Sequence, residues 1–535
     1  MNALLARPRL SALLAGFLSA TGFAPLQLWP VAIACLAALI LLVDAAPDRR
    51  SAFLRGWLFG VGHFTLGLNW IAHAFTYQDA MPHWFGYGAV LLLSLYLAAY
   101  PGFAALAAWW AARRSGAHGL PFFLLLFAAC WIGGEYLRAT LFTGFAWNPL
   151  GVVWLPTGVA IASTLIGTYG LGALLILAAG ALLLLIRRQF ASAAAIAAPL
   201  ALLALWGQLD RAPETPPGAP RIRVVQPNIG QDQKYSNEWG NYRKLATLSG
   251  TPRPAPRLIF WPEAAIPAYL DMEPEWRDRL AALLGPGDLL MTGADKVYFE
   301  EQDRGLYIDR KMVGAHNSLW IVTPEARLIG RYDKAHLVPY GEYLPMRPWL
   351  SAIGLSRLVP GDVDFWPGPG PRSLTLPPAA HPVSPLPEGH PPPVVVPTVM
   401  ETLRPSLKMG VQICYEIIFS GHVIDPADRP AFLFNPSNDA WFGSWGPVQH
   451  LAQARLRALE EGIPVIRSTP TGVSAVVDAR GHIVGALGAG RAGFLDTGLP
   501  PALPPTLFSR LGNWAGLLLA VFLVAIAIAT RLARR

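Results

Sequence analysis

Charged residues are scarce in this chain of 535 residues, and cysteines are almost absent. Asp, Glu, Lys and Arg make up 14% of the sequence, whereas an average soluble domain carries roughly 25%. Three cysteines exclude a disulfide framework. No histidine stands in a metal-ligand pattern with an acidic partner, so we expect neither a metal nor another cofactor. The chain is instead 53% hydrophobic, with a mean hydropathy of +0.37, which indicates a membrane protein with a soluble part.

Apolar runs that can cross a bilayer, which takes about 17–25 residues, recur along the chain. They begin near residues 8, 28, 52, 86, 120, 158 and 190, and a last run spans 512–530. Every second connection carries arginine: Arg7, Arg9, Arg49, Arg50, Arg55, Arg113, Arg114, Arg187, Arg188, Arg531, Arg534 and Arg535. The opposite loops are nearly free of Lys and Arg, as in "YQDAMPHWF" (77–85). This positive-inside pattern predicts eight spans, with both termini in the cytoplasm and the region after the seventh span outside.

The net charge of +8 is therefore largely a topology signal, and we expect no nucleic-acid partner. The N-terminal stretch "LSALLAGFLSATGFA" is similar to a signal peptide. A second apolar run follows it directly, and the alternation of arginines needs the first span. We expect the first span to be retained.

The composition divides the chain into three parts. Residues 1–209 are the predicted transmembrane helical domain with seven spans. The linker "APETPPGAP" opens a predicted soluble α/β domain over 210–502, and a C-terminal transmembrane helix follows over 503–535. Strands mixed with helices over this length indicate one α/β or α+β domain. Within it, the proline-rich stretch 367–397 cannot pair in the interior of a sheet, so we expect an extended surface insertion.

Strand candidates in the soluble part are short β-type runs between turns. They are 221–226, 257–263, 289–295, 317–324, 327–334, 407–416, 431–439, 464–472 and 474–485. Helical patterns fall at 273–284 and 447–461.

Three strand candidates end in reactive side chains: Glu263 in "FWPEAAIP", Lys334 in "YDKAHLVPYGEYLP" and Cys414 in "ICYEIIF". Strand ends are where an α/β sheet presents side chains to a crevice. A thiol attacks as a thiolate, so it needs a base for its proton and a cation for the developing oxyanion. A carboxylate and an ammonium meet those needs. Each residue also has an ordinary structural interpretation: a core cysteine, a helix-capping glutamate and a solvated lysine.

The other candidates give weaker signals. Cys35 and Cys130 lie in apolar runs, where cysteine acts as a small hydrophobic residue. The histidines His316, His336 and His450 are alternative bases for the thiol, but none has a context that marks it as one.

The combination resembles the nitrilase superfamily, and more closely its membrane-embedded family of apolipoprotein N-acyltransferases. The motifs "WPEAAIP", "YDKAHLVPYGEYLP", "ICYE", "NPSNDAWFG" and "ARLRALEEGIPVIRSTPTGVSAVVDARG" occur in that family's order over essentially the whole chain. The resemblance implies an αββα sandwich for the soluble domain, and the topology deduced from arginine agrees with that family.

The resemblance also implies roles for individual residues. It makes Cys414 the nucleophile, Glu263 the general base and Lys334 the oxyanion stabiliser. Glu342 matches a second essential glutamate of the family, and Tyr415 and Glu416 match required residues beside the nucleophile. Tyr235 stands where the family often has tryptophan, which keeps an aromatic ring but puts a role peculiar to indole in doubt.

The expected reaction is acyl transfer through a thioester on Cys414. The resemblance implies a phospholipid donor, such as phosphatidylethanolamine, and the N-terminal amine of a diacylated apolipoprotein as acceptor. It also implies the bacterial inner membrane as the location, with the catalytic domain in the periplasm. Two other interpretations stay open: a membrane-tethered amidase that uses water, and a transporter or receptor with an external binding domain.

Two further features of the membrane part are candidates for function. The apolar loops "WNPLGVVWLP" (147–156) and "DAWFGSWG" (439–446) are suited to admit acyl chains and screen solvent, with Trp147, Trp441 and Phe442 as lid or substrate-binding candidates. An interfacial aromatic belt is the alternative for the first loop. Glu135 and Arg138 lie one helical turn apart in the predicted fifth span. Charged residues within a membrane are candidates for function, and a structural ion pair is the alternative.

Overall fold

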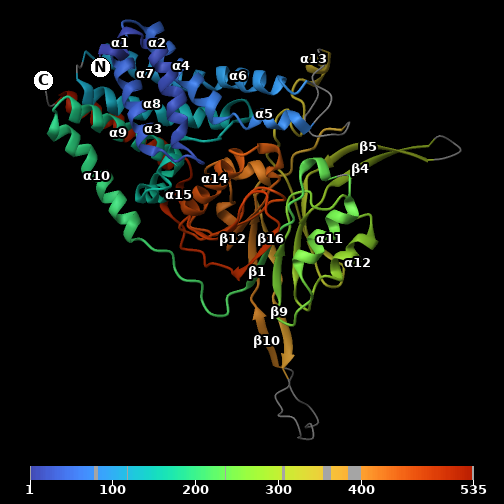
Figure 1. The fold of residues 1–535 in the computed structure, drawn as a ribbon. Helices are drawn as coiled ribbons and strands as arrows, with labels where there is room; N and C mark the ends of the chain where they lie inside the picture. The colour runs from blue at the N-terminus through green and yellow to red at the C-terminus, as the bar shows by residue number, and fades with distance from the viewer. Residues whose placement is uncertain are drawn as a thin grey trace, which may run out of the picture.

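The computed structural model describes residues 2–77, 82–116, 119–234, 236–303, 308–352, 363–383 and 399–532. The helices of residues 2–209 and the last helix of the chain gather in a bundle at one end of the molecule, and a sandwich of two β-sheets lies beneath them (Figure 1). The last helix of the chain returns to the bundle, so the two termini lie near each other on the bundle (Figure 1).

Each of the eight apolar runs found in the sequence is helical. The helices are α2 (Pro8–Ser19), α3 (Trp29–Asp44), α4 (Arg49–Gly67), α6 (Phe85–Leu97) continuing into α7 (Ala99–Arg114), α8 (Leu120–Thr140), α9 (Ser163–Ile186), α10 (Phe190–Leu209) and α16 (Trp514–Leu532). The short helices α1 (Asn2–Ala6), α5 (Ile71–Ala74) and α15 (Leu507–Leu511) complete this part. Within the described part of the chain, five helical segments are long and apolar enough to cross a membrane: Phe85–Arg114, Leu120–Thr143, Gly158–Ile186, Phe190–Leu209 and Trp514–Leu532.

The sandwich consists of two six-stranded sheets. The first has the order β16-β1-β2-β3-β6-β7, with β1 (Arg221–Gln226), β2 (Arg257–Phe260), β3 (Leu289–Gly293), β6 (Ser318–Val322), β7 (Leu328–Asp333) and β16 (Gly493–Gly498). The second has the order β15-β14-β13-β12-β11-β8, with β8 (Ser373–Leu376), β11 (Leu407–Val411), β12 (Phe432–Pro436), β13 (Val465–Ser468), β14 (Ser474–Val477) and β15 (Ile483–Leu487). The central strands of each sheet run parallel: β1, β2 and β3 in the first, and β11, β12 and β13 in the second.

The two sheets pack face to face, and helices cover their outer faces. Phe260 of β2 packs against Phe432 and Phe434 of β12 in the core between the sheets. The helices α11 (Glu238–Ser249) and α12 (Pro274–Ala281) cover the first sheet. Helix α14 (Gly446–Glu461) covers the second and contacts α9 of the bundle. The strands β2, β3, β12 and β13 are buried along their whole length because both faces of their sheets are covered, and the layers form the expected αββα sandwich.

Helix α14 also joins the sandwich to the bundle by polar contacts. The carboxylate of Glu460 accepts hydrogen bonds from the backbone N–H and the hydroxyl of Thr168 in α9, both at 2.6 Å, and from Ser420 at 2.9 Å. Arg457 lies 2.8 Å from the same carboxylate. The four residues are buried, so the second sheet and the membrane helices share one continuous interior.

The nucleophile strand ends earlier than the sequence suggested. Residues 407–416 were predicted as one strand, but β11 ends at Val411 and a 3₁₀ turn begins at Cys414. Cys414 has a φ of +51°, a left-handed conformation that cannot continue a strand. Sequence patterns also missed α11, the hairpin of β4 (Lys296–Asp303) and β5 (Ile308–His316), and the edge strand β16.

The described part of the proline-rich stretch, residues 367–383, lies at an edge, as expected for a segment that cannot pair in a sheet interior. Strand β8 is the last strand of the second sheet, where it pairs only with β11. Next along the chain, β9 (Ala379–Val383) pairs with β10 (Val399–Arg404) in a hairpin that projects away from the bundle (Figure 1). Residues 384–397 of the stretch lie outside the described residues.

Candidate active site

The three reactive residues predicted at strand ends converge in the structure. Glu263 follows β2, Lys334 directly follows β7, and Cys414 follows β11. The Lys334 ammonium lies 3.4 Å from Oε1 of Glu263, and the Cys414 thiol lies close enough to the Glu263 carboxylate for each group to shift the pKa of the other. All three side chains are buried, with at most 7% of any of them exposed. A nucleophile, a base and a cation therefore meet in one desolvated place.

Two further residues complete the surroundings of the lysine. Glu342 lies 3.0 Å from the Lys334 ammonium and accepts the Val338 N–H at 2.8 Å. The Asn317 amide donates to Glu263 at 2.7 Å and to Glu342 at 3.0 Å. Asn317 thus holds the two carboxylates on either side of one ammonium. Sequence reasoning missed Asn317, because an asparagine directly before a buried strand has no pattern that separates it from a turn residue.

The charges in the site hold each group in the protonation state that thiol chemistry needs. Burial works to raise the pKa of Glu263, but the Lys334 ammonium and the Asn317 amide outweigh it and lower this pKa below its ordinary value. Burial works to lower the pKa of Lys334, but the carboxylates of Glu342 and Glu263 raise it. Burial and the Glu263 carboxylate raise the pKa of the Cys414 thiol well above its ordinary value. The resting pair is therefore a neutral thiol beside an ionised carboxylate.

Glu416 ties the nucleophile turn to the lysine loop. One carboxylate oxygen accepts the Ile413 N–H at 2.7 Å. The other accepts the N–H groups of Ala335 and His336, at 2.7 and 3.1 Å, and the hydroxyl of Tyr332 at 3.0 Å. Four donors and a buried position make Glu416 a structural anchor, since it holds both loops and is saturated with internal bonds.

Tyr415 points in the opposite direction, toward the membrane bundle. Its hydroxyl donates to the Gly144 carbonyl at 3.4 Å, and its ring packs beside Phe145 and Phe419. Tyr415 is buried. It therefore connects the residue after the nucleophile to the loop that follows α8.

The aromatic lid candidates occupy different environments. Trp147 is fully buried, with its ring centroid 4.4 Å from that of Trp70 and 5.5 Å from that of Phe442. A ring with no exposed surface packs the interface between bundle and sandwich, and the lid or substrate-binding role of Trp147 stays a prediction. Trp441 and Phe442 are half-buried, and Trp441 contacts the Tyr77 ring edge-to-face. Tyr235 lies outside the described residues.

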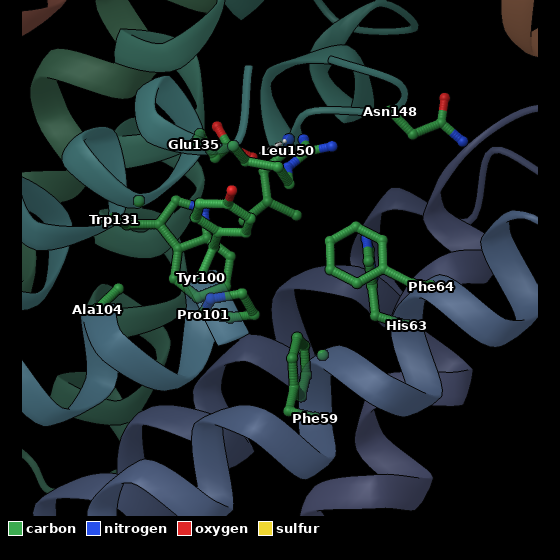
Figure 2. Close-up of a pocket in the computed structure, with 13 residues that line it drawn as sticks. Phe59, His63, Phe64, Tyr100, Pro101, Ala104, Trp131, Glu135, Asn148 and Leu150 are labelled. Atoms are coloured by element: carbon green, nitrogen blue, oxygen red, sulfur yellow. Dashed lines mark hydrogen bonds between the residues drawn. The ribbon is translucent and has the colours of Figure 1, made fainter. Parts of the chain in front are cut away.

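The charged pair Glu135 and Arg138 of α8 supports the loop that carries Trp147. Arg138 donates to the carbonyls of Phe145 and Trp147 at 2.7 and 2.9 Å. Glu135 accepts the Leu150 N–H at 2.7 Å. Both line a small, mostly apolar cavity in the bundle together with His63 and Asn148 (Figure 2). The geometry favours the structural alternative for this pair, since each side chain is used to hold backbone.

The histidines weighed as alternative bases lie elsewhere or face the wrong atom. His316 bonds the Trp366 carbonyl, and His336 stacks on Phe419. His450 lies 3.0 Å from the carbonyl oxygen of Cys414, on the backbone side of the nucleophile. The carboxylate of Glu263 is the group that the thiol meets.

Comparison with known proteins decides the family. Residues 15–181 match the model of the apolipoprotein N-acyltransferase N-terminal domain, and residues 221–502 match that of carbon-nitrogen hydrolases. The apolipoprotein N-acyltransferase of Rhodopseudomonas palustris is 34% identical, over 97% of this chain and 95% of its own. The chain belongs to the apolipoprotein N-acyltransferase family. The Caulobacter vibrioides member is also 34% identical, over 97% of this chain and 94% of its own.

Solved structures also align with part of this chain. A carbon-nitrogen hydrolase from Helicobacter pylori is 14% identical and aligns over 52% of this chain and 88% of its own, with a TM-score of 0.30. The apolipoprotein N-acyltransferase relatives match the chain over the bundle as well as the sandwich. The two matched family models and the long apolar helices indicate a bacterial membrane protein with a nitrilase-like α/β domain.

Proposed function

We propose that this enzyme transfers an acyl chain from a phospholipid to the N-terminal amine of a diacylglyceryl-cysteine, through a thioester on Cys414. Two observations carry the proposal: the near full-length match to apolipoprotein N-acyltransferases, and the buried contact of the Cys414 thiol with a carboxylate that also neighbours the Lys334 ammonium. We propose phosphatidylethanolamine as the donor, because the sequence resemblance implies it.

The first half-reaction forms the acyl-enzyme. Glu263 takes the thiol proton as the Cys414 sulfur attacks the carbonyl carbon of the sn-1 ester. The negative charge that develops on the carbonyl oxygen is stabilised by Lys334. Collapse breaks the ester C–O bond, and Glu263 returns the proton to the departing alkoxide. The products are a lysophospholipid and a thioester on the enzyme.

The second half-reaction forms the amide. The acceptor amine attacks the thioester carbon, and Glu263 takes the proton that the amine must lose. The tetrahedral oxyanion again lies beside Lys334. Its collapse expels the Cys414 thiolate, which recovers the proton from Glu263. A thioester suits this step because amines attack it readily, and the covalent intermediate divides one difficult step into two.

The polar residues around the site hold Glu263, Lys334 and Cys414 in their relative positions. Glu342 and Asn317 restrain Lys334 and Glu263, and Glu416 fixes the distance between the Cys414 turn and the lysine loop. The Phe442 ring lies 5.6 Å from the ring of His450, and Phe442 and the preceding Trp441 are our candidates for acyl-chain contact. A dry site matters here because water competes with the amine for the thioester.

We propose the following topology for the membrane part. Eight spans cross the inner membrane, with seven in residues 1–209 and one in 503–535. The arginine alternation supports cytoplasmic termini and a periplasmic catalytic domain over 210–502. Five helices that meet the length and hydropathy needed to cross a membrane support this layout. Both lipid substrates are anchored in a membrane, so a site attached to the bundle suits them.

A label-transfer assay tests the function. The full-length enzyme is incubated with phosphatidylethanolamine labelled in the sn-1 chain, with and without a diacylated peptide that has a free N-terminal amine. We expect label on the enzyme that moves to the peptide amine, and no labelled enzyme for Cys414→Ala. Cys130→Ala is the matched control and keeps both steps. An unchanged acyl-enzyme band in Cys414→Ala would refute the nucleophile, and near-normal turnover of Cys414→Ser would refute the thioester.

The same assay tests the amidase alternative. Its prediction is that water is the acceptor, so that label leaves the enzyme as free fatty acid at a rate independent of the peptide. The names of the full-length relatives do not favour this alternative. A transfer that depends on the peptide amine excludes it.

A further inference from the structure

His450 contacts the backbone of the nucleophile. Its Nε2 donates a hydrogen bond to the Cys414 carbonyl oxygen at 3.0 Å. The Asn435 amide donates to the same oxygen at 3.3 Å. A carbonyl oxygen only accepts, so the imidazole hydrogen facing it must lie on Nε2. Both donor side chains are fully buried.

This carbonyl belongs to a residue in an unfavourable backbone conformation. Cys414 has a φ of +51°, and a residue other than glycine in this region costs about 1–3 kcal/mol unless its surroundings enforce it. The direction of the Cα–Cβ bond, and so of the thiol, depends on that φ. Two hydrogen bonds to the carbonyl hold the peptide in the orientation from which the thiol reaches Glu263.

A buried charge cluster orients both donors. Arg467 lies 2.6 Å from Oδ1 of Asp439 and 3.0 Å from Nδ1 of His450, and it also donates to the side-chain oxygen of Asn435. Asp439 lies 3.0 Å from the same Nδ1. None of these side chains is more than 2% exposed. One guanidinium thereby fixes the imidazole and the amide that share the Cys414 carbonyl.

The membrane bundle closes the other side of His450. The ring of Trp147 lies 5.2 Å from the imidazole, and its indole N–H donates to the neighbouring Gln449 at 2.8 Å. Gln449 in turn donates to the Ala24 carbonyl, which precedes α3, at 3.1 Å. Arg138 of α8 holds the Trp147 backbone. The imidazole is therefore held between the sandwich interior and a loop of the membrane part.

We propose that His450 is a positioning residue of the acyl transfer: it holds the Cys414 carbonyl so that the thiol faces Glu263, and Trp147 of the membrane part keeps His450 in that orientation. The inference rests on the proposed role of Cys414 as nucleophile. It gives the bundle a part in the chemistry besides anchoring, because the contact that aligns the nucleophile is covered by a bundle residue.

The proposal is tested by substitutions that place an N–H donor at different positions of the side chain. The amide nitrogen of glutamine reaches the position of Nε2, whereas that of asparagine reaches the position of Nδ1. We expect His450→Gln to form the acyl-enzyme within about 10-fold of the wild-type rate. His450→Asn and His450→Leu should be slower than His450→Gln by a further 10-fold or more, with the half-saturating phospholipid concentration unchanged. His482→Gln, at an exposed histidine that also pairs with an aspartate, is the matched control with wild-type rates.

A second measurement needs no lipid. Alkylation of Cys414 by iodoacetamide, followed by mass spectrometry in a Cys35→Ala/Cys130→Ala background, reports the presentation of the thiol. We expect the same order, with His450→Gln above His450→Asn and His450→Leu, and a smaller decrease for Trp147→Phe, which keeps the ring and loses the N–H. If the variants are alkylated in this order but the wild-type enzyme never takes up acyl label, the proposed function fails and the positioning role stands.

Two results overturn the proposal. Equal rates for His450→Gln and His450→Asn in both measurements would show that the donor at Nε2 is irrelevant. A change confined to the half-saturating phospholipid concentration would assign His450 to lipid binding. If His450→Leu does not fold, the Gln–Asn pair decides alone, since both variants carry an amide of similar size.

Discussion

Glu416 accepts the backbone N–H of Ala335 at 2.7 Å, across the gap between the two loops that carry the nucleophile and the cation. The same carboxylate holds Ile413, the residue before Cys414. The separation of thiol and ammonium is therefore set by a buried group that is saturated by protein donors. The order of the site depends on this group as much as on the reacting residues.

Glu416→Gln should misalign the site. The glutamine amide puts an N–H donor against backbone donors, which leaves a buried donor unsatisfied at a cost of about 1–3 kcal/mol. A loop displacement of 1 Å lowers the rate about 10²-fold, so we expect that loss in acyl-enzyme formation, together with a lower Tm. Glu300→Gln, at an exposed position of β4, is the control. A wild-type rate in Glu416→Gln would contradict the anchoring role.

Lys334→Met should lose acylation by about 10²–10³-fold, the usual effect of removing one stabiliser of an oxyanion. Lys334→Arg should not restore it, because a planar guanidinium does not replace a compact ammonium between Glu263 and Glu342. Burst-phase measurement of the labelled enzyme gives the rate. Lys408→Met, at a lysine paired with Asp428 outside the site, should behave as wild type. A burst of normal rate in Lys334→Arg would refute the requirement for an ammonium.

Asn317→Leu should change the pH dependence of acylation. The Asn317 amide donates to ionised Glu263 and contributes to the lowering of its pKa below 4.5. Without that donor the charged carboxylate is less favoured, so the pKa rises and the base becomes protonated at a higher pH. The acid limb of the rate profile should therefore move to higher pH than in the wild type. The prediction is tested by measuring the rate of acyl-enzyme formation between pH 4 and 8 for both proteins. Superimposable pH–rate profiles of Asn317→Leu and the wild type would contradict the assignment of Glu263 as base.

Gly293→Ala should displace the base without touching its side chain. A Cβ at Gly293 would lie 2.3 Å from the Ala264 nitrogen and 2.9 Å from backbone atoms of Glu263. The strand end must shift, at a cost of about 1–3 kcal/mol, and we expect acylation to fall about 10-fold or more. Gly488→Ala, where no atom lies within 4 Å of the added Cβ, should leave rate and Tm unchanged. Equal rates for the two variants would exclude the displacement.

Arg457→Leu should loosen the junction between bundle and sandwich. It leaves the Glu460 carboxylate buried without its cation, and removing one partner of a buried ion pair costs about 3–5 kcal/mol. Thermal unfolding of the purified protein in detergent should show a lower Tm. The double variant Arg457→Leu/Glu460→Leu should recover part of the loss. Purely additive effects of the two single changes would mean that the pair does not interact.

The strands that precede the proposed catalytic residues could be predicted from the sequence better than the turns and loops that follow them. Glu263, Lys334 and Cys414 follow short buried strands with clear β patterns, so their convergence at strand ends could be expected. The αββα layers came from the family resemblance, because a single sequence does not state which of two sheets a strand joins. The turn at Cys414 could not be predicted, since its left-handed conformation is imposed by Asn435 and His450 from distant strands and helices.

The residues that sequence reasoning missed act through contacts between distant segments. Asn317 bridges the carboxylates of Glu263 and Glu342, which are 79 positions apart in the chain. Trp147 was predicted as a lid or substrate-binding residue from its aromatic loop, and the structure shows that its ring is buried against Trp70 and Phe442. An aromatic side chain has the same sequence pattern in either environment, so only the packing distinguishes them.

Helix α14 has a consequence for any attempt to handle the two parts separately. Apart from its partly exposed Val448 and Arg455, the helix is buried along its length, with residues such as Leu451, Ala454 and Ala458 inside the shared core. A fragment cut from the bundle at residue 210 would expose this apolar face to water, a surface that promotes aggregation. One side of the sandwich is therefore too apolar to face water, and it is stable only where the helices of the bundle cover it.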